Sequence, residues 1–308
     1  MARKYMYFLN EEREKLSVLE KLVPALLIFF LLFTTFVFNQ IIAKQHSVVA
    51  VEQDCDYLWS IQENYLEEQR IKLQKELEAA QKKRYVDLTN EDFDKMQHIY
   101  SHKDEKIVFL TFDDGPTSNI TPQVLDILKA YDVKATFFVL GKQVVRNPDL
   151  IRREYNEGHS IESHTYSHSY KTVYASKESF FDEFNRTQTS LQECLGVDGF
   201  RTLVVRMPGG TVGGPYHNIK KEISSELRSK GIASLDWNCL TKDAEGANTY
   251  EAIMNNVYTY TGNKTSVVLL MHDADTKQIT ADTLPKVIEY YRDNGYKFVT
   301  VEDYLGRV

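Results

Sequence analysis

The chain has few cysteines and no excess of positive charge. Cys55, Cys194 and Cys239 are its only cysteines among 308 residues, so disulfides are not the framework of the fold. A Cys194–Cys239 pair stays open, because three thiols cannot all pair. Lysine and arginine together number 37 against 44 aspartates and glutamates, which gives a net charge of −7. Such a balance provides no overall basic surface, and we predict no nucleic-acid partner.

Charge is absent altogether from residues 22–43, which form a long apolar run. A helix of this length would measure about 33 Å and would cross a bilayer core of about 30 Å. No small-residue cleavage site clearly follows it, so we interpret it as an uncleaved transmembrane anchor rather than a cleaved signal or a buried helix. Five lysines and arginines precede the run, and Lys44 is the only nearby one after it. This asymmetry predicts a cytoplasmic segment over residues 1–21 and a single-pass cell-membrane protein with the remainder outside the cell.

Glycine and proline are missing from residues 44–103, where glutamate, glutamine, lysine and leucine are frequent. Leu66, Leu73 and Leu77 follow a helical spacing, which predicts a helical stalk or linker. The apolar stripe changes register before three to four heptads are complete, so a sustained coiled coil is not supported. Dimerisation through the stalk remains the alternative to a simple spacer.

The pattern changes from about residue 104 to the end at residue 308, where short apolar runs alternate with amphipathic helical stretches. This alternation is typical of parallel strands covered by helices, and the number of units favours a barrel over an open sheet. We therefore predict an α/β domain built as a distorted (β/α) barrel of about seven parallel strands. The predicted strands are KIVFLTF, KATFFVL, HSIES, TLVVRM, IASLDW, SVVLLMH and KFVTV.

Ionisable side chains occur where five of these strands end. In parallel barrels the carboxyl ends of the strands share one rim, where reactive groups collect. The convergence predicts a functional site rather than a set of unrelated polar turns. The residues are Asp113, Asp114, His164, Arg206, Asp236 and His272.

Two histidines in SHTYSH, His164 and His168, lie four residues apart, so both imidazoles can face one point. Two imidazoles and a carboxylate from elsewhere in the chain form a common site for Zn²⁺ or a related divalent ion. Taken alone, the hexapeptide fits two surface histidines as well. Together with the acidic pair, it predicts a metal centre.

These motifs resemble those of the polysaccharide deacetylases with a NodB-type domain, carbohydrate esterase family 4. The resemblance covers about residues 106–305, and its most specific part is TFDDGPTSNITPQVLDILKAYDVKATFFVLG. GHSIESHTYSH is similar to the second motif of the family and RMPGG to the third. The pair Asp236-Trp237 is similar to the fourth, and Leu270-Met271-His272 to the fifth.

The resemblance implies a role for each matching position. Asp114, His164 and His168 would hold one divalent metal ion, with Zn²⁺ expected and Co²⁺, Ni²⁺ or Mn²⁺ as alternatives. Asp113 would be the general base and Arg206 would hold it in place. His272 would be the general acid, oriented and charged by Asp236.

Other positions would contact the substrate. The resemblance implies that Trp237 and Leu270 line a pocket for the acetyl methyl group. Backbone N–H groups around Gly209 and Gly210 could donate to the tetrahedral oxyanion, because that task needs no side chain.

The sequence departs from the family pattern at two motifs. The third commonly reads Arg-Pro-Pro-Tyr-Gly, whereas here Met207 and Gly209 replace two positions that shape the cleft. The second has Ser163 where asparagine is usual, which affects support of the ligands rather than their number. Substrate preference is therefore open.

Together these observations predict metal-dependent de-N-acetylation of an extracellular amino-sugar polymer, with N-acetylglucosamine of peptidoglycan as the favoured substrate. The alternatives are an O-deacetylase acting on xylan or an exopolysaccharide, and a catalytically silent carbohydrate-binding domain. A silent relative would be expected to have lost ligands, whereas Asp114, His164 and His168 are all present.

Overall fold

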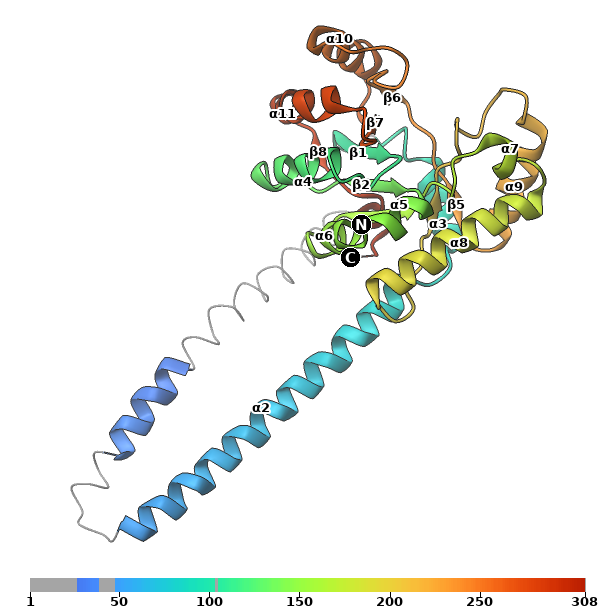
Figure 1. Cartoon of the computed structure of the whole chain (residues 1–308). Coiled ribbons are helices and arrows are strands. Elements are labelled where there is room, and N and C mark those ends of the chain that lie inside the picture. The colour runs from blue at the N-terminus through green and yellow to red at the C-terminus, as the bar shows by residue number, and fades with distance from the viewer. Residues whose placement is uncertain (1–26, 39–47, 103–104, 308) are drawn as a thin grey trace. The chain divides into compact units, whose positions relative to one another are not determined.

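The computed structural model describes residues 27–38, 48–102 and 105–307 (Figure 1). The chain divides into two units, Met1–Glu76 and Leu77–Val308. The predicted span at 22–43 is described only over 27–38, which is helical and exposes most of its apolar side chains. No helix in the described part of the chain is long and apolar enough to cross a membrane. The cytoplasmic segment predicted at 1–21 lies outside the described residues.

Much of the segment predicted as a stalk at residues 44–103 is helical, but its C-terminal part belongs to the folded domain. Helix α2 runs without interruption over Val48–Arg84. Beyond it, Tyr85, Leu88, Phe93 and other apolar side chains are buried, so this segment is part of the folded domain rather than a linker reaching residue 103. Leu88 and Phe93 belong to the same buried cluster as Phe109 and Val268, whereas Tyr85 belongs to the larger cluster of the domain. Dimerisation through the stalk stays a prediction.

Helix α3 (Asn90–Gln97) fixes this N-terminal part of the domain. Thr89 and Asp92 form a reciprocal capping box at its first turn, a local signal that begins a helix there. Arg307, near the other end of the chain, donates to Asp92 Oδ2 at 2.6 Å. The two ends of the domain are thus joined.

The domain is built on one sheet whose strands are paired in parallel. Its order is β5-β4-β3-β2-β1-β7-β6, and β8 pairs with the start of β1. All seven predicted strands are present, and β6 is an additional, eighth strand. Their bounds are β1 Ile107–Asp113, β2 Thr136–Val139, β3 Ser160–Ser163, β4 Val204–Val205, β5 Ala233–Ser234, β6 Cys239–Leu240, β7 Ser266–His272 and β8 Lys297–Phe298.

Helices follow most strands and cover the outside of the sheet (Figure 1). Their bounds are α4 Ile120–Ala130, α5 Gly141–Arg146, α6 Pro148–Asn156, α7 Tyr170–Val173, α8 Lys177–Leu195, α9 His217–Ser229, α10 Tyr250–Thr261, α11 Gln278–Asp293 and α12 Val301–Leu305.

The barrel is not closed by hydrogen bonds, because its two edge strands, β5 and β6, do not pair with each other. These two strands are nevertheless consecutive in the chain. Leu235 N–H still donates to Val205 of β4, and Asn238 N–H donates to Val268 of β7. Only Asp236 and Trp237 therefore cross the gap. Cys194 and Cys239 are free thiols, so the pair left open by the sequence is not formed.

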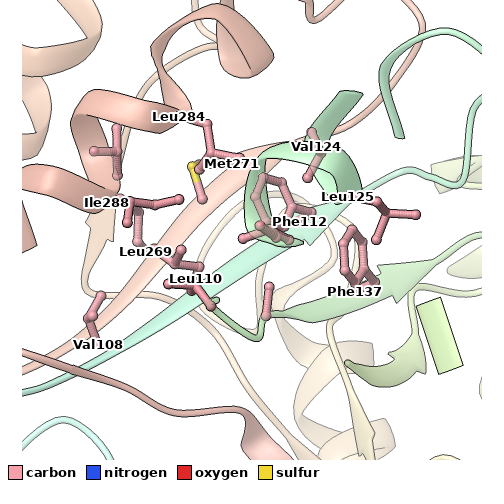
Figure 2. Close-up of a cluster of buried hydrophobic side chains, with 14 of the residues drawn as sticks. Val108, Leu110, Phe112, Val124, Leu125, Phe137, Leu269, Met271, Leu284 and Ile288 are labelled. Atoms are coloured by element: carbon pink, nitrogen blue, oxygen red, sulfur yellow. The ribbon is translucent and has the colours of Figure 1, made fainter. Parts of the chain in front are cut away.

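Alternation along β1 and β7 separates an outer layer from the barrel interior. Outward side chains of these strands pack against α4 and α11, as Figure 2 shows. Inward side chains include Phe109 and Val268, in a second cluster. With a period of two residues, Asp113 and His272 also face inward at the upper end. The labelled residues of the outer layer are Val108, Leu110, Phe112, Val124, Leu125, Phe137, Leu269, Met271, Leu284 and Ile288.

Candidate active site

A sharp turn after β1 carries two consecutive carboxylates, of which Asp113 is buried and Asp114 is half-buried. Asp113 is the last residue of the strand, and Asp114 adopts the left-handed region with a φ of 79°. A Cβ on Gly115 would lie 2.0 Å from Asp273 Oδ2, so only glycine lets the turn pass this close to Asp273. The backbone N–H of Asp273 donates to the Asp113 carbonyl at 3.1 Å. The turn is therefore fixed to the end of β7.

Asp273 is a buried carboxyl group that is not among the residues predicted for the site. It accepts a hydrogen bond from the Thr121 hydroxyl, and its carbonyl accepts one from Thr117 Oγ1 at 2.6 Å. Burial raises the pKa of Asp273 to about 7, and the charge of Asp114 adds to the effect. We interpret it as support for the acidic turn.

Asp114, His164 and His168 bring three donor atoms to within 4.8 Å of one another. His164 Nε2 is 3.8 Å and His168 Nε2 is 3.5 Å from Asp114 Oδ1. His164 Nδ1 is 2.7 Å from the Arg206 carbonyl, which can only accept, so Nδ1 carries the proton and Nε2 has a free lone pair.

This set of residues fits a divalent ion. Asp114 Oδ1 is buried without a hydrogen-bond partner in the described part of the chain, which is costly unless a cation compensates. Burial and the charge of His164 lower the pKa of His168, which favours the neutral imidazole that a metal requires. The predicted ligands are thus brought together.

Arg206 supports Asp113 from inside the barrel, as predicted. The guanidinium is fully buried, and its Nη1 donates to Asp113 Oδ1 at 2.8 Å and to Thr111 Oγ1 at 2.7 Å. Its Nε donates to the Leu235 carbonyl at 3.2 Å. Oδ1 of Asp113 is therefore occupied, whereas Oδ2 faces His164 Nε2 at 3.7 Å.

The predicted partner of His272 is wrong: Asp243 takes the place assigned to Asp236. His272 Nδ1 is 2.9 Å from Asp243 Oδ1, and the His272 backbone N–H donates to Asp243 Oδ2 at 2.8 Å. Burial alone would lower the pKa of His272, but the hydrogen bond and charge of Asp243 outweigh it and raise that pKa to about 9. For Asp243 burial acts in the opposite direction and would raise the pKa, but the hydrogen bonds and charge of His272 outweigh it and lower that pKa.

Asp236 instead fastens the loop after β4. Its carboxylate accepts from the Thr211 N–H at 2.9 Å, and its carbonyl accepts from Arg206 Nη2 at 3.2 Å. It lies where the chain crosses the gap in the barrel, one strand before Asp243. Reading Cys239-Leu240 as a further short strand would have identified Asp243, because Asp243 follows that strand as the other site residues follow theirs.

The predicted substrate-contacting residues have different environments. The Gly210 N–H donates to the Met207 carbonyl at 2.8 Å, so it closes a turn and is not free for an oxyanion, contrary to the prediction. The Gly209 N–H makes no hydrogen bond within residues 105–307. Trp237 lines a cavity of about 510 Å³. Leu270 is buried and, by the alternation of β7, faces inward below His272.

Comparison with known proteins agrees with this geometry. Residues 100–229 match the family described as Polysaccharide deacetylase. The peptidoglycan-N-acetylglucosamine deacetylase PgdA of Listeria monocytogenes is 34% identical over 212 residues, which cover 69% of this chain and 41% of PgdA. A peptidoglycan-N-acetylglucosamine deacetylase of Bacillus cereus is 32% identical over 203 residues, covering 65% of this chain and 89% of that protein.

Solved structures show the same architecture. A Streptococcus mutans CE4 esterase superposes with a TM-score of 0.60 at 31% identity, over 70% of this chain and 95% of that one. The alignment with PgdA spans less than half of that relative, whereas the Bacillus cereus protein is matched over most of its length. The chain therefore belongs to the polysaccharide deacetylase family of hydrolases.

Proposed function

We propose that this chain is a metal-dependent de-N-acetylase that acts on an amino-sugar polymer outside the cell, with N-acetylglucosamine of peptidoglycan as its substrate. The observation that carries the proposal is the pairing of Asp113 with His272 in register on the adjacent strands β1 and β7. The candidate base and the candidate acid thereby stand side by side, next to the donor atoms of Asp114, His164 and His168.

Amide hydrolysis needs a polarised carbonyl, an activated water and a proton for the departing nitrogen. A divalent ion bound by Asp114, His164 and His168 would polarise the carbonyl and lower the pKa of water. Asp113 Oδ2 accepts the proton of the attacking water, because Arg206 already occupies Oδ1 and keeps the carboxylate oriented.

His272 supplies the proton that the leaving group needs. With a pKa of about 9 it is protonated at neutral pH, and Nδ1 is held by Asp243, so Nε2 is the proton-donating atom. Water oxygen bonds to the acetyl carbon, the carbon–nitrogen bond breaks, and the proton goes to nitrogen. The products are acetate and a free amino sugar.

The choice of substrate rests on the similar proteins, two of which are named as acting on N-acetylglucosamine of peptidoglycan. Hydrolysis of an O-acetyl ester is the second candidate, because the same groups suit an ester and the similar Streptococcus mutans protein is named an esterase. A silent binding domain is disfavoured by the unpartnered Asp114 Oδ1, which has no structural use in the described residues.

The location outside the cell is supported by the charge-free run at 22–43 and by the five cations that precede it. Protease added to intact cells should remove the region after Lys44 and leave residues 1–21 protected. Full protection of the whole chain would contradict this location.

The function is tested with the purified full-length chain, peptidoglycan fragments and mass spectrometry. Wild type should remove acetyl groups from N-acetylglucosamine, rather than from N-acetylmuramic acid or from O-acetyl positions. Asp113→Asn should keep bound metal, measured by elemental analysis, and lose about 10²- to 10⁴-fold in turnover. Asp114→Asn should lose both. If Asp113→Asn loses the metal while Asp114→Asn keeps it, the assignment of roles is wrong.

A further inference from the structure

The third motif lacks the tyrosine that the family commonly carries, because Gly209 stands at that position. Gly209 has a φ of 72°, in the left-handed region that favours glycine. A Cβ built there would lie 2.5 Å from Tyr170 Oη and 3.1 Å from Tyr170 Cε1. The Tyr170 ring therefore covers the Gly209 backbone and occupies the space that a side chain at 209 would need.

Tyr170 comes from a different element and lies beside the metal ligands. It is the first residue of α7, two positions after His168, and its ring meets the His168 ring edge-on with centroids 5.7 Å apart. About 39% of Tyr170 is exposed, and its hydroxyl makes no hydrogen bond within residues 105–307. The ring thus has a structural neighbour, whereas the hydroxyl is free for a ligand.

The loop beneath Tyr170 is held in place. The Tyr174 hydroxyl donates to the Pro208 carbonyl at 2.8 Å, and Lys220 Nζ donates to the Gly209 carbonyl at 3.3 Å. The rings of Tyr170 and Tyr174 are 5.9 Å apart, with Tyr174 buried. Tyr174 is therefore the structural member of the pair, and Tyr170 is the exposed member, next to His168.

We propose that Tyr170 contacts the sugar that carries the scissile acetyl group, in place of the tyrosine that the family commonly has at position 209. The aromatic ring forms a wall for the apolar face of the pyranose, and the hydroxyl exchanges a hydrogen bond with a polar group of the sugar. This inference rests on the proposed function. It adds a specificity-determining residue that comes from the segment after the second motif.

The contact itself is tested by a double-mutant cycle that does not depend on activity. Gly209→Ala should lower the denaturation midpoint, both because of its positive φ and because of the collision with Tyr170. In a Tyr170→Ala background the backbone contribution is unchanged but the collision is absent. Gly209→Ala should therefore lower the denaturation midpoint less in that background than in wild type. An equal loss in both backgrounds would show that Tyr170 does not occupy this space.

The role in recognition is tested by comparing an N-acetylglucosamine tetramer with 4-nitrophenyl acetate, which carries an acetyl group but no sugar. Tyr170→Phe should lower kcat/KM on the tetramer about 2- to 10-fold, and Tyr170→Ala about tenfold or more. Both variants should hydrolyse the ester at nearly the wild-type rate. Tyr258→Ala, which removes an exposed tyrosine of α10, is the matched control and should change neither substrate.

The outcomes separate the two proposals. A wild-type chain that is inactive on acetylated amino sugars would overturn the proposed function and the sugar contact with it. If wild type is active but Tyr170→Ala loses equal activity on the tetramer and on the ester, only the role of Tyr170 is overturned. The same holds if Tyr170→Ala loses activity on neither substrate.

Discussion

Replacing Asp243 by asparagine should move the pH dependence of activity, because Asp243 controls the protonation of His272. The difference between the ordinary histidine pKa of 6.5 and about 9 corresponds to about 3 kcal/mol in favour of the charged ring. Most of this support comes from Asp243, with smaller contributions from Asp113 and Asp114. An amide side chain keeps the shape but removes the charge.

The direction of the shift in the pH profile follows from the protonation state of His272 that the reaction requires. In wild type His272 stays protonated until the pH rises through about 9, so the high-pH limb of the rate profile should lie there. In Asp243→Asn only the smaller contributions of Asp113 and Asp114 oppose the effect of burial, so the limb should fall to about 6.5 or below. At pH 8 the protonated fraction would then decrease about thirtyfold, whereas at pH 6 most activity should return.

The assay is the initial rate of acetate release from an acetylated amino-sugar oligomer between pH 5 and pH 10, together with an NMR titration of the His272 ring. Asp236→Asn is the matched control, because Asp236 was predicted from sequence to charge His272 but contacts Thr211 instead. Its limb should remain near that of wild type. An unchanged limb in Asp243→Asn, or a shifted limb in Asp236→Asn, would refute the reasoning.

Two further predictions concern stability, measured by chemical denaturation. Arg206→Met should lower the free energy of unfolding by about 3–5 kcal/mol, because it leaves the buried Asp113 carboxylate unpaired. The control Arg152→Met removes an exposed ion pair and should lower it by less than about 1 kcal/mol. Similar losses in the two variants would contradict the buried pairing. Gly115→Ala should lower the free energy of unfolding by about 1–3 kcal/mol, because its Cβ would lie 2.0 Å from the Asp273 carboxylate. Wild-type stability in this variant would show that the turn can relax.

Much of the fold and of the candidate metal site could be predicted from the sequence because their signals are local. The apolar run of β1 ends at an acidic turn, and the four-residue spacing of His164 and His168 lies within one loop. A parallel barrel then requires such strand ends to meet at one rim, whatever the details of packing. Arg206 followed from the same rule, and the structure places it against Asp113.

Other features depend on distant segments and only the tertiary structure decided them. Burial of Tyr85 and Phe93 shows that the domain begins before the predicted boundary, since a helical pattern does not reveal which surface will cover it. The partner of His272 depends on where the chain crosses the gap in the barrel, which makes Asp243 rather than Asp236 its neighbour. Likewise, Tyr170 and Gly209 are far apart in sequence, and only the packing of α7 over the third motif places the ring where glycine leaves room.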